Sequence, residues 1–342
     1  MISKVKIKNK FNKKTLIILL SILILLMFNP LIRAESIDIG IINPYEDINW
    51  DNINYYKANL HTHTKNSDGF HTTKTVIDEY IKNNYDILAI TDHNKYTWPW
   101  EDYGVNVNEL KISRIAGSEI SNTHHLGSYF NDYASKERNE DMVLSEIEKR
   151  NGLAVFFHPG RYNKTIKWYS YFFKEYDHLV GIEVFNKNDR YPRDRKLWDR
   201  LLFELMPDNP VWGFANDDMH NIATDFGWHY NVFLLTENTI KNIKNAMMNG
   251  HFYIYNPQEQ KEAMQFYIEN ISVINSTIEL SIKGEYNKIE WISFNSITQK
   301  SEVIKTGNSI DLSEYILITN FIRAKITGDK GIIYTQPFGM KF

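Results

Sequence analysis

The chain has 342 residues, 43% of them hydrophobic and 14% aromatic, which is enough for one large folded domain and a smaller one and excludes a disordered chain. It contains no cysteine, which excludes thiolate zinc sites, disulfide scaffolds and cysteine nucleophiles. The formal net charge is −3, and its basic residues are unevenly distributed along the chain.

The first 34 residues have the layout of a secretory signal. Six lysines between residues 4 and 14 precede the apolar run 16–28, and Ala34 marks the expected cleavage position. The run is short for a membrane-spanning helix, which needs ~20 apolar residues, but Ile32 breaks the small-residue rule for cleavage, so a retained N-terminal anchor stays open. We expect a secreted or extracytoplasmic protein. Removing this segment takes away seven basic residues and no acidic one, and the resulting charge of −10 argues against extended nucleic-acid binding.

Residues 35–54 are polar and rich in asparagine, and we expect a lead-in segment there. From residue 55, short apolar runs alternate with amphipathic stretches. This pattern predicts strands at 86–90, 111–116, 153–157, 179–185 and 211–215, and helices at 73–84, 137–150, 194–206 and 237–248. Such alternation indicates βα units around a parallel sheet. About seven units favour closure into a barrel over an open sheet.

Histidines and carboxylates follow the apolar runs. All 11 histidines lie between His61 and His251. His61 and His63 are two residues apart, so both side chains point to one face of a strand, and Asp218 and His220 repeat this spacing. In α/β folds function lies at the carboxyl ends of strands. Because imidazole and carboxylate are ligands for Zn, Mn and Fe, the sequence predicts a site for several metal ions.

Three further candidate ligands follow other strands or turns. Asp68 lies in a Ser-Asp-Gly turn, and His93 ends a Thr-Asp-His stretch directly after an apolar run. Glu119 follows another run, and a carboxylate there could bridge two ions. Asp92 is expected to orient the loop that carries His93 or to support a ligand.

His158 and Arg161 combine a ligand with a cation in one His-Pro-Gly-Arg stretch. The planar guanidinium of Arg161 suits a phosphate oxyanion, and Arg161 and Asp92 are the predicted catalytic residues. The histidines that fit no motif are expected to be ordinary residues: His71, His178, His229 and His251. The aromatic residues that we expect to pack loops are Trp98, Trp100, Tyr103, Trp168, Tyr169 and Tyr171.

Beyond residue 255 the spacing of apolar residues changes to a period of two. Turn signals at Gly284, Gly307 and Gly328 separate the runs. This pattern predicts a small all-β, sandwich-like domain over residues 256–342, which could bind a surface partner. The expected organisation is therefore a signal or anchor (1–34), a lead-in (35–54), a hydrolase domain (55–255) and this β domain.

Taken together, the motifs HTHT, SDG, TDH, HxxG, HPGR and DxH resemble those of the PHP superfamily, the polymerase and histidinol phosphatase domain, over roughly residues 55–255. The resemblance implies a distorted seven-stranded βα barrel that holds two or three divalent ions (Mn, Fe or Zn). It also implies nine ligands shared among three ions: His61, His63, Glu119 and Asp218; Glu119, His124 and His158; and Asp68, His93 and His220. His124 is preferred to His125 because it gives the HxxG spacing.

The resemblance implies a metal-dependent phosphoesterase that uses an activated water to hydrolyse a phosphate mono- or diester. The expected substrate is a small phosphorylated compound such as a nucleotide, a sugar phosphate or a short oligonucleotide. Two other interpretations stay open. One is a metal-dependent hydrolase of an amide or cyclic ester, because an activated water does not select its electrophile. The other is a non-catalytic protein that attaches to a surface through its β domain.

Overall fold

The computed structural model describes residues 40–315 and 319–341. The predicted signal segment lies outside the described residues, as does the start of the lead-in segment at 35–39. The described residues belong to one compact unit. None of the helices in this part of the chain is long and apolar enough to cross a membrane.

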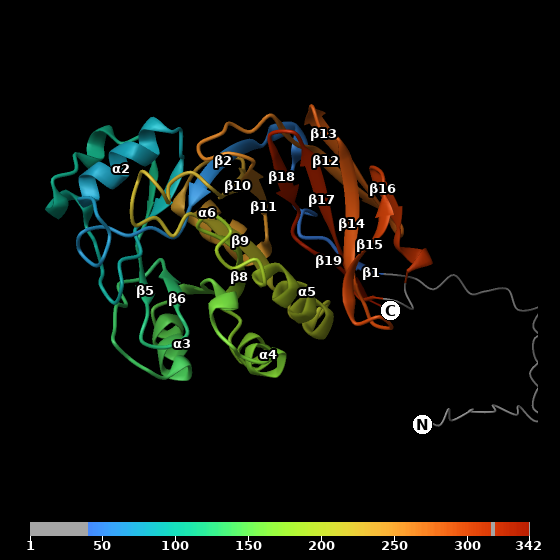
Figure 1. The fold of residues 1–342 in the computed structure, drawn as a ribbon, viewed down its shortest axis with the longest axis horizontal. Helices are drawn as coiled ribbons and strands as arrows, with labels where there is room; N and C mark the ends of the chain where they lie inside the picture. The colour runs from blue at the N-terminus through green and yellow to red at the C-terminus, as the bar shows by residue number, and fades with distance from the viewer. Residues whose placement is uncertain (1–39, 316–318, 342) are drawn as a thin grey trace, which may run out of the picture. The chain divides into compact units, whose positions relative to one another are not determined.

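The described chain contains both helices and strands up to β11 and consists mostly of strands after it (Figure 1). The α-helices are α2 (Thr73–Lys82), α3 (Glu140–Lys149), α4 (Ile166–Glu175), α5 (Asp194–Leu205) and α6 (Ile240–Asn249). The strands up to β11 are β1 (Gly40–Ile42), β2 (Asn54–Asn59), β3 (Ile87–Ala89), β4 (Ser113–Ile115), β5 (Gly117–Ile120), β6 (Leu126–Tyr129), β7 (Leu153–Phe156), β8 (Leu179–Asn186), β9 (Trp212–Asn216), β10 (Tyr230–Leu235) and β11 (Phe252–Pro257). The later strands are β12 (Phe266–Ile274), β13 (Thr277–Gly284), β14 (Lys288–Asn295), β15 (Lys300–Thr306), β16 (Ser309–Asp311), β17 (Phe321–Gly328), β18 (Gly331–Tyr334) and β19 (Phe338–Lys341).

Two sheets position the predicted ligands. The larger has 11 strands along the path β1-β19-β17-β18-β11-β10-β2-β3-β4, with β14 attached to β17 and β15 to β14. Within it β2, β3 and β4 run parallel. The second sheet has five strands in the order β5-β6-β7-β8-β9, and its strands β7, β8 and β9 are also parallel. The βα units of the sequence are therefore present, but they are divided between two sheets.

The predicted closed barrel is not confirmed, because the described strands form separate sheets that are not closed. The chain passes from β4 in one sheet to β5 in the other through a single residue, Ala116. Between β9 and β10 a side chain takes the place of a backbone ladder: the buried amide of Asn231 donates to the carbonyl of Ala215 (2.8 Å) and accepts from its N–H (3.0 Å). The fold is therefore a mixed α/β structure with two open sheets.

The four predicted helices are confirmed, and polar side chains set where three of them begin. The hydroxyls of Thr72 and Thr239 and the amide of Asn139 accept hydrogen bonds from the first turns of α2, α6 and α3. Gly250 ends α6 in the left-handed conformation at φ 75°.

Helix α4 was not predicted, and its aromatic residues were expected to pack loops. It is a regular helix that begins at the cap Thr165. Its residues Tyr169, Phe172 and Phe173 are buried at helical spacing, so one face of α4 packs into the core. The expectation of a loop was wrong because the many aromatic residues obscured this amphipathic spacing.

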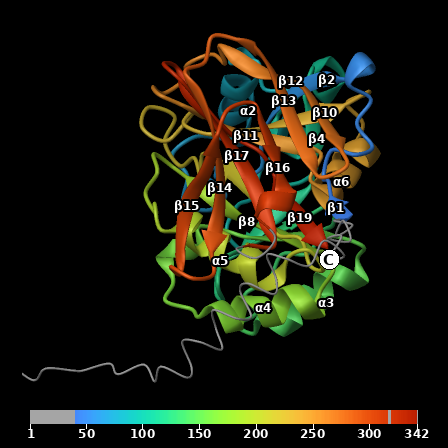
Figure 2. The ribbon, with the colours of Figure 1, turned by 90° about the vertical axis from the view of Figure 1, so that its right-hand side faces the viewer.

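The C-terminal strands form two layers (Figure 2). One is a three-stranded sheet, β12-β13-β16, and the other consists of strands that extend the large sheet. Ile278 and Leu280 of the first layer and Trp291 and Ile326 of the second belong to one buried cluster. The predicted boundary at residue 255 falls inside β11, which pairs with β18, and β1 pairs with β19. A separate C-terminal domain stays a prediction.

Candidate metal centre

The predicted ligands come from segments far apart in sequence and meet where the two sheets approach each other. His61 and His63 follow β2, His93 follows β3, and Glu119 lies on β5. Two isolated backbone bridges, Thr62 to Met219 and His93 to Glu119, join these segments. The site is therefore built at the strand ends, as the sequence predicts.

The first group consists of His61, His63 and Asp218. The Nε2 atoms of the two histidines lie 3.1 Å apart. Oδ1 of Asp218 lies 3.3 Å from Nε2 of His61 and 3.2 Å from Nε2 of His63. All three residues are buried, so their donor atoms converge on one point away from solvent.

Glu119 stands between this group and the next. Its Oε2 atom lies 3.3 Å from Nε2 of His61 and 3.0 Å from Nδ1 of His93. Its Oε1 atom lies 2.6 Å from Nδ1 of His125 and 3.4 Å from Nε2 of His158. The two oxygens of one fully buried carboxylate thus face different histidines, which is the arrangement expected of a bridging ligand.

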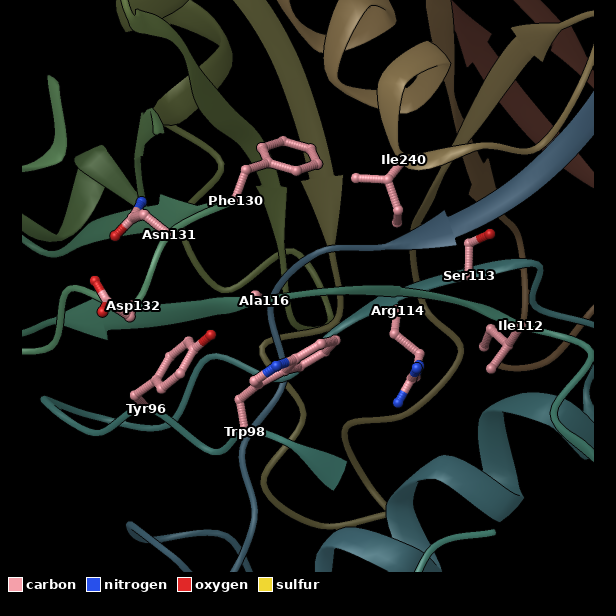
Figure 3. A pocket seen from close by; sticks show the side chains of 10 residues that line it. All are labelled: Tyr96, Trp98, Ile112, Ser113, Arg114, Ala116, Phe130, Asn131, Asp132 and Ile240. Atoms are coloured by element: carbon pink, nitrogen blue, oxygen red, sulfur yellow. The ribbon is translucent and has the colours of Figure 1, made fainter. Parts of the chain in front are cut away.

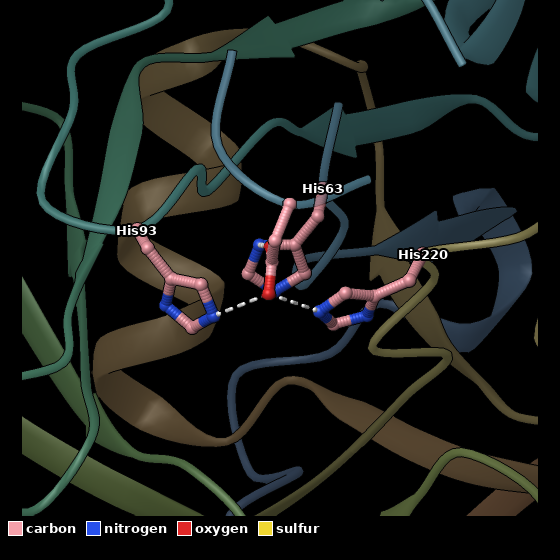
Figure 4. A group of neighbouring side chains, drawn as sticks. His63, His93 and His220 are labelled. Atoms are coloured by element: carbon pink, nitrogen blue, oxygen red, sulfur yellow. Dashed lines mark ion pairs between the residues drawn. The ribbon is translucent and has the colours of Figure 1, made fainter. Parts of the chain in front are cut away.

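Asp68 organises a third group near the surface. Its Oδ2 atom lies 3.4 Å from Nε2 of His93 and 3.3 Å from Nε2 of His220, and its Oδ1 atom lies 3.7 Å from Nδ1 of His63. Figure 4 shows His93 and His220 turned toward the carboxylate from opposite sides, with His63 next to them. The side chain of Asp68 is 53% exposed, so this group is the one most open to a substrate.

The geometry fits divalent ions. Bonds of about 2.0–2.2 Å to one tetrahedral ion place neighbouring donor atoms about 3.3–3.6 Å apart, and the separations in the first group are 3.1–3.3 Å. Several donor atoms are also buried without a hydrogen-bond partner among the described residues, which is rare in native proteins unless an ion or water satisfies them. Two of them are Nδ1 of His63 and Nδ1 of His158.

The electrostatics point the same way. Burial alone would lower the pKa of His61, but the carboxylates of Glu183 and Asp218 raise it well above its usual value. Burial likewise opposes the charged form of His93, yet hydrogen bonding to Asp68 raises its pKa to about 10. Without metal, His61 and His93 therefore favour the protonated form, and divalent ions would displace these protons on binding.

One glycine and one histidine show how the backbone brings the ligands together. A Cβ at Gly69 would lie 2.7 Å from the backbone of His63 and Thr64. Only glycine therefore lets the Ser-Asp-Gly turn pack against the segment that carries His63. His158 has a φ of 30° at the start of the short 3-10 helix Pro159–Arg161. A positive φ at a non-glycine residue costs energy and is typical of functional sites.

One predicted ligand does not join the cluster. His124 points the other way: its Nε2 atom lies 2.7 Å from the hydroxyl of Tyr169, and its ring stacks on Trp168 at 5.5 Å. His125 takes its place against Glu119. The choice of His124 is therefore corrected to His125. The other eight predicted ligands are brought together.

Asp92 holds the ligand loops rather than facing the cavity. It is fully buried and accepts hydrogen bonds from the N–H and hydroxyl of Thr64 (both 2.7 Å), the hydroxyl of Ser67 (2.6 Å) and that of Thr97 (2.5 Å). These bonds tie the segments carrying His63 and Asp68 to the loop after β3. Of the two roles weighed for Asp92, the geometry supports orienting this loop.

Glu183 is a residue of the site that the sequence reading missed. Its Oε1 atom accepts from Nδ1 of His61 (2.8 Å) and from the amide of Asn216 (2.9 Å). Its Oε2 atom accepts from the backbone N–H of His158 and from the amide of Asn186 (both 2.9 Å). A signal was present, because Glu183 is the one charged residue of β8, whose eight residues are all buried.

Basic side chains line the mouth of the site. A cavity of about 250 Å³ contains the exposed edge of the histidine cluster together with Arg161, Lys187 and Arg190. Nζ of Lys187 lies 3.5 Å from Oδ2 of Asp225. Among the residues that the structure describes, no carboxylate pairs with Arg161 or Arg190. Lys187 and Arg190 follow β8 and were not predicted.

The four histidines expected to be ordinary lie outside the groups that could hold an ion among the described residues. His229 is buried, and burial lowers its pKa to about 4. Asp217, next to the ligand Asp218, accepts backbone hydrogen bonds from Gly227, Trp228 and His229 instead of joining the cluster.

The chain is similar to a known protein family in sequence and to solved structures in fold. The model of the PHP domain matches residues 59–306, which extends past the expected end at 255. A two-domain protein from Bacteroides vulgatus containing a predicted PHP-like metal-dependent phosphoesterase has a similar fold, with a TM-score of 0.51 and 18% identity over 85% of this chain and 96% of its own. An amidohydrolase from Chromobacterium violaceum aligns with a TM-score of 0.42 and 16% identity over 56% of this chain and 96% of its own. No protein of curated function matches the sequence.

Proposed function

The chain belongs to the PHP domain family, and from this premise we propose that it is an exported, metal-dependent phosphoesterase that hydrolyses a small phosphate mono- or diester. The observation that carries the proposal is the cavity that Arg161, Lys187 and Arg190 line together with the histidine and carboxylate cluster. Arg161 and Arg190 have no carboxylate partner among the described residues, which favours an anionic substrate. A neutral amide or ester would leave them unpaired.

The side chains of the site have distinct tasks in this reaction. Divalent ions held by the cluster would supply Lewis-acid activation of a water molecule and of the phosphoryl group. Glu183 accepts a hydrogen bond from Nδ1–H of His61 and so keeps Nε2 turned toward the cluster. The guanidinium of Arg161 can donate two parallel hydrogen bonds to phosphoryl oxygens. Asp92 keeps the ligand loops in register.

The test is hydrolysis by protein loaded with Mn, Fe or Zn, with p-nitrophenyl phosphate and bis(p-nitrophenyl) phosphate as substrates. Loss of a charged hydrogen bond costs about 1.5–3 kcal/mol, so Arg161→Ala should lower kcat/KM for the phosphate ester roughly 10- to 100-fold. Arg200→Ala, on the exposed side of α5, is the matched control and should leave kcat/KM unchanged.

Two results would overturn the proposal. One is the absence of activity on both esters in metal-loaded protein. The other is hydrolysis of amide or lactone substrates that Arg161→Ala reduces as strongly as hydrolysis of phosphate esters. Export is tested separately, by sequencing the N-terminus of protein recovered from outside the cytoplasm. Cleavage near Ala34 is the expected result.

A further inference from the structure

A second cavity, of about 510 Å³, lies outside the metal centre (Figure 3). None of the predicted metal ligands lines it. Its walls come from the loop after β3, from β4, from the loop after β6 and from the start of α6. The volume is within the range of ~300–1,000 Å³ that is typical of small-molecule sites.

Aromatic rings form two of the walls and are held in place. The ring of Trp98 lies 6.0 Å from that of the fully buried Trp100, and the guanidinium carbon of Arg114 lies 5.2 Å from the Trp98 ring centre. Phe130 adopts a φ of 60° and donates its N–H to the carbonyl of Ala116 (2.8 Å). Figure 3 shows Trp98 and Phe130 on opposite sides of Ala116. Trp98 is therefore supported by Trp100 and Arg114, and the backbone of Phe130 is anchored to Ala116.

The charges in this cavity are balanced, unlike those at the metal centre. Arg114 pairs with Glu101 at 3.1 Å, and Asp132 pairs with Arg150 at 3.2 Å. Each pair leaves further hydrogen-bonding positions on the guanidinium or carboxylate. Each charge that borders the cavity therefore has an opposite charge next to it, which favours a neutral ligand over a phosphate or an ammonium group.

Polar groups alternate with the rings around the cavity. Burial, with Asp132 nearby, raises the pKa of Tyr96 and keeps its hydroxyl protonated. Tyr96 and Asp132 border one side, and Arg114 borders the same wall as Trp98. A ligand with an apolar C–H face and several hydroxyl groups matches this alternation better than a lipid, which would leave the polar groups unpaired.

We propose that this cavity binds a neutral saccharide. A sugar ring would stack its C–H face on Trp98, and its hydroxyl groups would bond to Arg114, Asp132 and Tyr96. This site is independent of the proposed hydrolysis. The loop after β3 connects it to the metal centre, because the hydroxyl of Thr97, between Tyr96 and Trp98, bonds to Asp92 (2.5 Å).

The experiment is isothermal titration of the full metal-loaded chain with maltose, cellobiose and diacetylchitobiose, with adenosine as a planar neutral competitor. We expect at least one disaccharide to bind. Loss of a stacking ring should weaken its affinity about tenfold in Trp98→Ala, whereas Trp98→Phe should keep most of it. Trp50→Ala, a partly buried tryptophan outside this cavity, is the matched control.

Unchanged metal content in Trp98→Ala, by elemental analysis, shows that the neighbouring loop is intact and that the loss belongs to the cavity. The proposal is overturned if no disaccharide binds the wild-type protein. It is equally overturned if Trp98→Ala and Phe130→Ala bind as the wild type does, or if adenosine binds and the disaccharides do not.

Discussion

At the scale of single residues, the site depends on carboxylates that face histidines. Glu183 is the clearest case, because four hydrogen bonds from His61, His158, Asn186 and Asn216 converge on its two oxygens. It fixes both the ring of one predicted ligand and the backbone of another. A partner of this kind commonly changes metal affinity 10- to 100-fold when it is removed.

Glu183→Gln should therefore lower the affinity for Mn or Zn by about 10- to 100-fold, because an amide nitrogen replaces one acceptor oxygen. Competition with a chromogenic chelator measures this directly and does not depend on activity. Glu204→Gln, exposed on α5, is the control and should bind metal as the wild type does. An unchanged affinity in Glu183→Gln would remove Glu183 from the site.

Protonation of the same histidines predicts how the metal-free protein responds to pH. A histidine whose pKa is higher in the folded than in the unfolded chain adds stability below the unfolded value of about 6.5, and this stability is lost as pH rises through the folded pKa. The pKa values of His61 and His63 are raised, and that of His93 is raised to about 10.

The melting temperature of protein stripped with EDTA should therefore fall between about pH 6.5 and 10. Metal-loaded protein should fall less over the same range, because ligation requires the neutral rings at every pH. Scanning calorimetry at several pH values compares the two forms. Equal slopes with and without metal would contradict the charged cluster.

At the scale of elements, loops rather than strands carry most of the ligands, and buried acids hold these loops. Asp217 accepts from the N–H groups of Gly227 (2.8 Å), Trp228 (2.8 Å) and His229 (3.2 Å) and from the hydroxyl of Tyr80 (3.1 Å). Asp217 therefore ties together the two ends of the loop between β9 and β10, and this loop carries Asp218 and His220.

Asp217→Ala should lower the free energy of unfolding by about 3 kcal/mol or more, since each buried donor left without an acceptor costs about 1–3 kcal/mol. Chemical denaturation measures the loss. Asp177→Ala, at an exposed position, should change stability by less than about 0.5 kcal/mol. A comparable loss in both variants would show that Asp217 has no special role in the loop.

At the scale of the whole molecule, buried polar contacts join the C-terminal region to the elements that precede β11. Arg323 on β17 forms two hydrogen bonds to Asp199 on α5, at 2.7 and 3.0 Å, with both side chains 3% exposed. The amide of Gln336 bonds to both backbone groups of Gly213 on β9.

Removing one partner of a buried ion pair leaves the other charge uncompensated, so Arg323→Ala should cost about 3–5 kcal/mol of unfolding free energy. Asp199→Ala should cost a similar amount, and the double variant less than the sum of the two. Lys74→Ala breaks an exposed pair with Asp78 and should cost under about 1 kcal/mol. Additive losses in a denaturation cycle would mean that Arg323 and Asp199 do not interact.

The sequence by itself determined the features that depend on local pattern. Four of the five described α-helices and the strands β3, β4, β7, β8 and β9 follow from periodicity and turn residues. Eight of the nine candidate ligands, named from their motifs, lie together in the structure. These signals are local, because a strand end or a helix cap is set by neighbouring residues.

Only the tertiary structure decided between His124 and His125. Adjacent residues of an extended segment point to opposite faces, so the choice depends on what each face packs against. His124 stacks on Trp168 and contacts the hydroxyl of Tyr169, both on the unpredicted helix α4. His125 therefore points the other way and contacts Glu119.

Glu183 and the open sheets were decided in the same way. Glu183 meets residues up to 122 positions away in the chain, and the side chain of Asn231 takes the place of the ladder that would join β9 to β10. Contacts between distant segments leave no periodic trace in the sequence, so the fold has to bring them together before they can be recognised.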